Sequence, residues 1–311
     1  MRRADIVHLG LLLAALAAAY ALPFELVLLS YAILGPAHYF TEISWLHDRG
    51  YFLPHRALAA VPAAVAFAAM FIATPYWLGL TLWCLFAAGA IAATTARRRT
   101  ALLYGAIAVA STLAMIAVDL PFALIGILLP TFIHVCVFTL VFMTLGALRA
   151  GSGVQFAILG VYVAAIVLIL IVPPWAGSAV PGLARIAQEN FGTVAPALGS
   201  LIGVPDLTFG GRVTGLLSFV YTYHYLNWFI KADVIRWSNV PRPRLIAIAI
   251  LSAASTALYF YDFNVGILVL LLVSLLHVLL EFPLNAISIG QLGAYAFRRR
   301  GLVSSAPRLS P

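Results

Sequence analysis

The sequence contains very little charge for its length. Only 9% of its 311 residues are charged, whereas 64% are hydrophobic and the mean hydropathy is +1.05. A soluble globular domain carries about 25% charged residues and about 45–50% apolar ones. This composition excludes a soluble enzyme and a disordered chain, and it indicates an integral membrane protein.

Cysteine and acidic residues are also scarce. Cys84 and Cys136 both lie in apolar stretches, which excludes a disulfide-rich scaffold. There are 10 acidic residues against 18 basic ones, and the net charge is +8. The basic residues occur singly or in short clusters between apolar stretches, a pattern typical of membrane topology. We therefore expect membrane lipid as a partner and no nucleic acid, while the sequence leaves protein partners unknown.

The apolar stretches predict an all-α polytopic membrane helix bundle that forms one membrane domain over residues 1–311. A helix needs about 20 mostly apolar residues to cross a bilayer. About ten stretches meet this requirement, at 4–21, 23–46, 57–74, 76–94, 101–118, 121–148, 154–175, 213–233, 244–261 and 264–284. The longest connection, at about 176–212, is predicted to be external.

The distribution of basic residues predicts the orientation of the bundle. If the N-terminus is cytoplasmic, 16 of the 18 basic residues fall in cytoplasmic segments, and only Arg185 and Arg212 fall in the external connection. This asymmetry follows the positive-inside rule. It predicts ten spans with both termini in the cytoplasm, and we expect a bacterial inner membrane.

The first 22 residues also have features of a secretory signal peptide. Arg2 and Arg3 precede an apolar run that ends near Ala19-Tyr20-Ala21. The apolar run is long for a signal peptide. We therefore expect this segment to be the first span and not a cleaved leader.

Four of the seven histidines lie inside predicted spans, where an ionisable side chain indicates function. They are His38, His134, His224 and His277. Counted from the outer end of each span, all four lie about 17–22 Å deep. Ligands of one metal ion must share a depth, whereas independent structural histidines need not. Since imidazole binds iron, copper, zinc and nickel, the pattern predicts a shared metal site. A haem held by two histidines, a proton or ion pathway, and unrelated packing are the alternatives.

Two glutamates follow histidines at helical spacing and are the candidate catalytic residues. Glu42 lies four residues after His38, and Glu281 lies four residues after His277. Residues at this spacing share a helix face, so each glutamate can face the same interior site as its histidine. The carboxylates can orient the imidazole rings or bind the metal directly.

Aromatic and amide side chains near the histidines are candidates for substrate binding. These are Tyr39, Tyr221, Tyr223, Tyr225 and Asn227. Large flat side chains at this depth favour a cleft for a long, apolar, conjugated substrate. Ordinary core packing explains the same residues equally well.

The segment Gly35-Pro36-Ala37-His38, followed by Glu42, resembles the GxPHGxxD signature of the bacterial Brp-like β-carotene dioxygenases. In this chain the proline is displaced by one position, and Tyr39 replaces the glycine after the histidine. The resemblance implies a multispan membrane protein that cleaves β-carotene to retinal. It also implies non-haem Fe(II) held by histidines, His38 among them, with O₂ as co-substrate.

The sequence thus predicts a membrane-embedded non-haem iron oxygenase that acts on a carotenoid or a similar long apolar lipid. Three alternatives remain open at this point. They are a di-iron lipid hydroxylase or desaturase, a transporter coupled to protons or ions, and a bis-histidine haem electron carrier. The clustered HxxHH boxes of well-known membrane desaturases are missing from the sequence.

Overall fold

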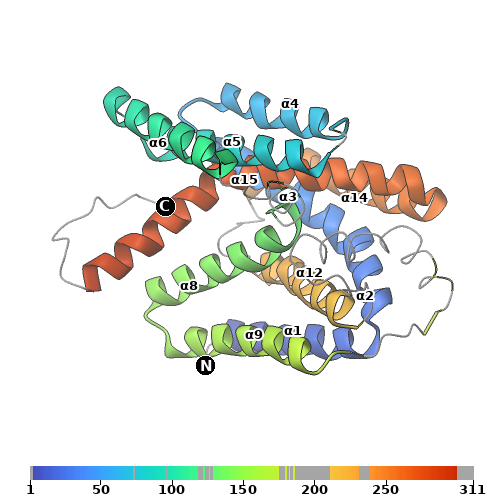
Figure 1. Cartoon of the computed structure of the whole chain (residues 1–311). Helices are drawn as coiled ribbons and strands as arrows, with labels where there is room; N and C mark the ends of the chain where they lie inside the picture. Colours follow the sequence, from blue (N-terminus) through green and yellow to red (C-terminus); the bar gives the residue numbers. More distant parts are fainter. Residues whose placement is uncertain are drawn as a thin grey trace.

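The computed structural model describes residues 3–299 apart from 73, 96, 118–121, 123–125, 127–128, 175–178, 181, 183–184, 186–210 and 231–238. Among these residues every regular element is a helix, so the predicted all-α bundle is confirmed (Figure 1). The predicted external connection at 176–212 falls almost wholly outside the described residues.

The helices follow the predicted apolar stretches closely. In chain order they are α1 (Arg3–Ala21), α2 (Pro23–Leu29), η1 (Ser30–Leu34), α3 (Gly35–Asp48), η2 (Gly50–Phe52), η3 (Arg56–Ala59), α4 (Ala60–Ala69), α5 (Pro75–Thr94), α6 (Arg98–Ala117), η4 (Leu129–Phe138), α8 (Thr139–Ala150), α9 (Gly153–Ile171), α12 (Arg212–Ile230), α14 (Arg242–Tyr261) and α15 (Phe263–Arg299).

Eight helices of the described chain are long and apolar enough to cross a membrane, and each coincides with a predicted span. The predicted span at 57–74 corresponds to a shorter apolar helix, Arg56–Ala69. The predicted span at 213–233 corresponds to α12, which is less apolar and carries ten buried residues. The polar side chains of a membrane helix face the interior of the bundle and not the lipid, which agrees with the burial of α12.

The surface of the bundle is apolar, as expected for a protein surrounded by lipid. Helix α6 is the clearest case, since it is 20 residues long and has no buried side chain. Leu102, Val109 and Leu113 each expose more than half of their surface. An apolar helix with so much exposed surface is unfavourable in water and normal in a bilayer. The long apolar helices therefore indicate a membrane protein, and the direction of insertion stays a prediction from the basic residues.

The helices pack in two groups with a central layer between them. Helices α1, α9 and α12 lie together on one side, and α4, α5 and α6 lie on the other (Figure 1). Helix α15 runs through the centre and packs against α3, α4, α5 and α14. It continues well beyond the predicted end at residue 284, with Pro283 inside it. Helices α3, α12 and α15 and the segment η4 bring polar side chains to this centre.

Two π-helical segments interrupt the α-helical geometry close to the centre. The segment η1 immediately precedes Gly35 and Pro36, and η4 includes Pro130. Proline lacks a backbone N–H and clashes with the carbonyl four residues earlier, and a wider turn relieves this clash. The π turns change the rotation of the residues that follow. They therefore help to determine which way His38 and His134 point.

Candidate metal centre

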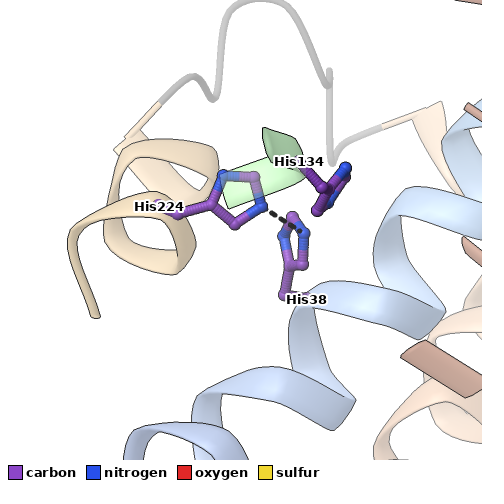
Figure 2. A group of neighbouring side chains, drawn as sticks. All are labelled: His38, His134 and His224. Atoms are coloured by element: carbon purple, nitrogen blue, oxygen red, sulfur yellow. Dashed lines mark hydrogen bonds between the residues drawn. The ribbon is translucent and has the colours of Figure 1, made fainter. Parts of the chain in front are cut away.

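Four histidines from four separate elements meet at the centre of the bundle. His38 comes from α3, His134 from η4, His224 from α12 and His277 from α15. Figure 2 shows three of these rings converging. The ring centroids of His38 and His134 each lie 4.8–5.3 Å from those of His224 and His277. The four histidines, for which the sequence predicted only a common depth and a shared site, thus lie close together.

All four histidine side chains are buried. His38 and His277 are each 1% exposed, and His134 and His224 are 2% and 9% exposed. His55, by contrast, is exposed. Buried imidazoles need partners for both ring nitrogens.

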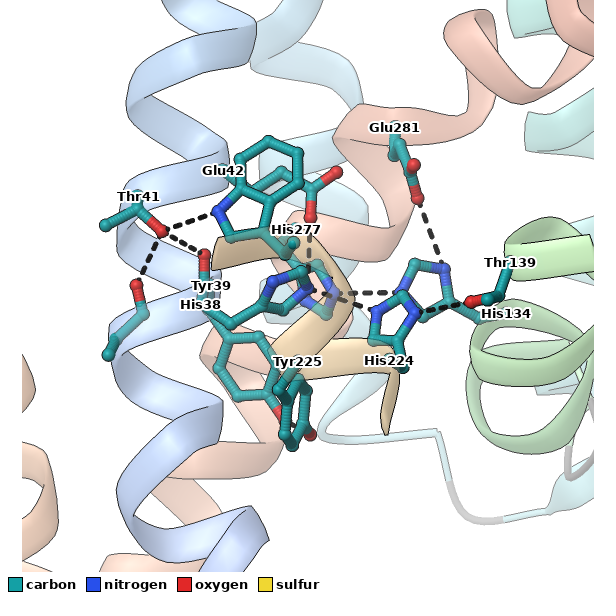
Figure 3. A network of polar contacts seen from close by, with 12 residues as sticks. His38, Tyr39, Thr41, Glu42, His134, Thr139, His224, Tyr225, His277 and Glu281 are labelled. Carbon is teal, nitrogen blue, oxygen red and sulfur yellow. Dashed lines mark hydrogen bonds and ion pairs between the residues drawn. The ribbon is translucent and has the colours of Figure 1, made fainter. Parts of the chain in front are cut away.

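Two outer ring nitrogens face polar side chains (Figure 3). Nδ1 of His224 lies 2.8 Å from Oγ1 of Thr139, at hydrogen-bond distance, whereas Nδ1 of His134 lies 3.3 Å from Oε2 of Glu281, an ion-pair contact without a hydrogen bond. Glu281 accepts a hydrogen bond from Nδ2 of Asn285 at 3.4 Å. An ionised carboxylate beside Nδ1 of His134 favours a proton on that nitrogen. A neutral imidazole has one N–H, so a proton on Nδ1 leaves the Nε2 lone pair of His134 facing the centre. This arrangement is usual for histidines that bind metals.

The inner Nε2 atoms lie in two close pairs. Those of His38 and His224 are 3.2 Å apart, and those of His134 and His277 are 3.0 Å apart. A tetrahedral ion with bonds of about 2.0–2.1 Å holds its ligand atoms about 3.3 Å apart. The ligand atoms of His38, His134 and His224 all lie within 4.8 Å of one another. The spacing therefore fits a single bound ion.

Glu42 occupies a different position from Glu281. Its Oε2 atom lies 3.0 Å from Nε2 of His38, the nitrogen that faces the centre. Glu42, His38 and His277 form a second group whose ligand atoms lie within 4.8 Å of one another. Because both ligand groups share His38, they describe one centre and not two. Glu42 can therefore bind the ion itself, whereas Glu281 contacts the outer side of a ring.

The buried carboxylates at the centre also suit a cation. Glu42 is 2% exposed and Glu281 is 3% exposed. Among the contacts described, Glu42 lies beside His38, and Glu281 lies beside His134 and Asn285. An ionised carboxylate inside a membrane bundle is costly without compensation. One divalent cation would balance both charges, and the four neutral imidazoles could supply its ligands.

Two tyrosines line the side of the histidines opposite the carboxylates (Figure 3). The ring of Tyr39 stacks on His277 with centroids 4.4 Å apart, and the ring of Tyr225 lies 5.1 Å from that of His38. Their hydroxyl oxygens are 2.6 Å apart. A side chain at Gly35 would meet the Tyr39 hydroxyl at 3.0 Å, so glycine leaves room for this ring.

The other predicted substrate residues lie further out. Tyr221 contacts Tyr225, with centroids 5.9 Å apart. Tyr223 and Asn227 contact His8 instead, and both distances to its Nε2 atom are 2.8 Å. Tyr223 also packs against Tyr162 in the apolar core. Residues 223 and 227 share a face of α12, so the structure places both in a network with α1.

Thr139 is a site residue that sequence reasoning missed. Threonine inside an apolar helix usually bonds to its own backbone, so nothing in the sequence singled it out.

No family model, curated protein or solved structure matches the chain. The geometry of the chain itself shows an apolar helical bundle whose four clustered histidines could bind a metal ion.

Proposed function

We propose that this protein is a membrane-embedded non-haem iron oxygenase acting on a carotenoid or a similar long apolar lipid. The observation that carries the proposal is the pairing of four inward-facing imidazoles with two buried carboxylates. Imidazole and carboxylate together suit Fe(II) better than soft Cu(I), which prefers thiolate and thioether ligands. Bound Fe(II) would supply the activation of O₂.

The residues of the chain have distinct roles in this proposal. His38, His134, His224 and His277 hold the ion. Glu42 binds the ion or a proton beside it, because it faces the inner nitrogen of His38. Glu281 keeps the Nε2 lone pair of His134 directed inward.

The tyrosine side of the centre is the proposed approach for substrate. The carboxylates occupy the opposite side, and Tyr39 and Tyr225 present flat rings to the histidines. A conjugated apolar chain packs well against such rings. A lipid substrate can reach a membrane-embedded centre from the bilayer without passing through water. The segment Gly35–Glu42, which resembles the Brp-like dioxygenases, contributes His38, Tyr39 and Glu42 to this centre.

The geometry argues against two of the alternatives. A haem needs a wide flat slot between two axial histidines, but here four rings pack with centroids 4.8–5.3 Å apart. A di-iron centre needs two ligand sets, but the two groups of ligand atoms share His38.

Elemental analysis and an optical spectrum of the detergent-purified protein test this proposal. We expect about one iron per chain and no Soret band, followed by O₂-dependent conversion of β-carotene to a product such as retinal. His134→Ala should lose both iron and turnover, whereas the control His55→Ala should keep both. A Soret band would refute the non-haem site. An absence of retained metal after purification without chelators would favour a transporter.

A further inference from the structure

Two tryptophans form a continuous ring contact between the buried centre and the polar end of α3. The indole ring of Trp228 meets the His38 ring edge-on, with centroids 5.5 Å apart and planes at 87°. Trp45 meets Trp228 in the same way, with centroids 5.7 Å apart. Each ring thus contacts the next, and the first of them contacts a proposed metal ligand.

The position of Trp228 is fixed by a hydrogen bond. Its Nε1 atom donates to Oγ1 of Thr41 at 3.0 Å, and Thr41 is anchored to the backbone of α3 through Ala37 and His38. Tryptophan side chains of membrane proteins are enriched at the interface between lipid and water. An interfacial side chain needs no ring contact with His38, so the observed contact requires another explanation.

The far end of the contact reaches the surface. Trp45 is partly exposed, and α3 ends at Asp48, which is exposed together with the following Arg49. The Arg49 guanidinium lies 5.0 Å from the centroid of the Trp45 ring. A positive group beside the ring attracts small anions to this end. An anionic reductant in the water phase can therefore approach Trp45.

We infer that Trp228 and Trp45 carry electrons from the surface to the centre when it is oxidised without substrate. This inference rests on the proposed redox function of the centre. Tryptophan is among the side chains most easily oxidised by one electron, and adjacent rings in contact exchange electrons readily. The pair would protect His38 and its neighbours from oxidation.

The electron balance can be written with hydrogen peroxide as the oxidant and ascorbate as the donor. Trp228 gives one electron to the oxidised centre, and Trp45 then restores Trp228. Ascorbate restores Trp45 from the water phase. Two such transfers and two protons convert one hydrogen peroxide into two water molecules, and one ascorbate becomes dehydroascorbate.

The test uses the full-length protein in detergent, loaded with Fe(II) and exposed to hydrogen peroxide without any lipid substrate. The readouts are the fraction of chains that still bind iron and the sites of oxidation found by peptide mass spectrometry. In the wild-type protein we expect ascorbate to preserve iron binding. When ascorbate is left out, we expect oxidation to occur mainly at Trp45 and Trp228. In Trp228→Phe and Trp45→Phe we expect several-fold faster loss of iron binding, with little protection by ascorbate.

The controls separate electron transfer from packing. Trp77→Phe changes an exposed tryptophan in α5 and should behave as wild type. Protein loaded with redox-inert Zn²⁺ should show no oxidation of Trp45 or Trp228. If Trp228→Phe fails to retain iron before peroxide is added, Trp45→Phe decides the question, since Trp45 contacts the centre only through Trp228 among the ring contacts described.

Three outcomes would overturn the inference. One is equal loss of iron binding in wild type and in both variants, with and without ascorbate. Another is the same tryptophan oxidation in the zinc-loaded protein. Neither outcome contradicts the proposed iron site, because wild-type protein still binds iron before peroxide is added. Wild-type protein that binds no iron would instead refute the proposed function, and this inference with it.

Discussion

The exchange of Glu281 for glutamine separates the role of charge at the centre from the role of shape. Glutamine keeps the size of the side chain but removes the negative charge that lies 3.3 Å from Nδ1 of His134. Without that charge, His134 loses its preference for the tautomer whose Nε2 lone pair faces inward. The charge balance of a divalent ion with two carboxylates is lost as well.

The structure sets the expected size of this effect. Glu281 contacts the outer nitrogen of a ligand, and loss of such a partner typically weakens metal binding about 10–100-fold. This corresponds to about 1.4–2.7 kcal/mol of binding free energy. The metal-free protein should respond in the opposite direction, because Glu281→Gln removes a carboxylate whose ionised form is costly to bury.

The assay compares iron affinity, measured by competition with a chelator, with the Tm of the metal-free protein. We expect Glu281→Gln to bind iron more weakly while its metal-free form melts no lower than wild type. Glu25→Gln is the matched control, since Glu25 is a buried glutamate that accepts from the backbone N–H of Val180. Wild-type affinity in Glu281→Gln, together with a lower Tm of its metal-free form, would show that Glu281 is a structural residue.

Three further predictions follow from the same geometry. His224→Ala should abolish iron retention, as measured by elemental analysis, and full occupancy in this variant would contradict a shared site. Chelation of the wild-type protein should lower its Tm, since a ligand at about 1,000 times its Kd stabilises the folded state by about 4 kcal/mol; an unchanged Tm would argue against a bound structural ion. Thr139→Val should weaken iron binding several-fold, because it removes the oxygen 2.8 Å from Nδ1 of His224. Thr139→Ser should restore the affinity, and equal weakening in both variants would assign the effect to packing.

The sequence alone predicted the class of fold and a common depth for the four histidines. Membrane helices can be recognised in a sequence because each span requires about 20 apolar residues to cross the lipid. The residue count from each outer end then predicted a common layer for His38, His134, His224 and His277, which the structure brings together. Helical rise is nearly constant, so depth can be calculated without knowledge of which helices are neighbours.

Only the tertiary structure decided which side chains meet within that layer. Spacing predicted that Glu281 faces the same site as His277, but it did not predict that the carboxylate would contact His134 on η4. Tyr223 lies beside His224 in the sequence, yet its hydroxyl contacts His8. Contacts within the layer depend on helix rotation, which η1 and η4 alter, and on which helices pack together. Both depend on interactions between residues far apart in the chain, which periodicity along one helix does not encode.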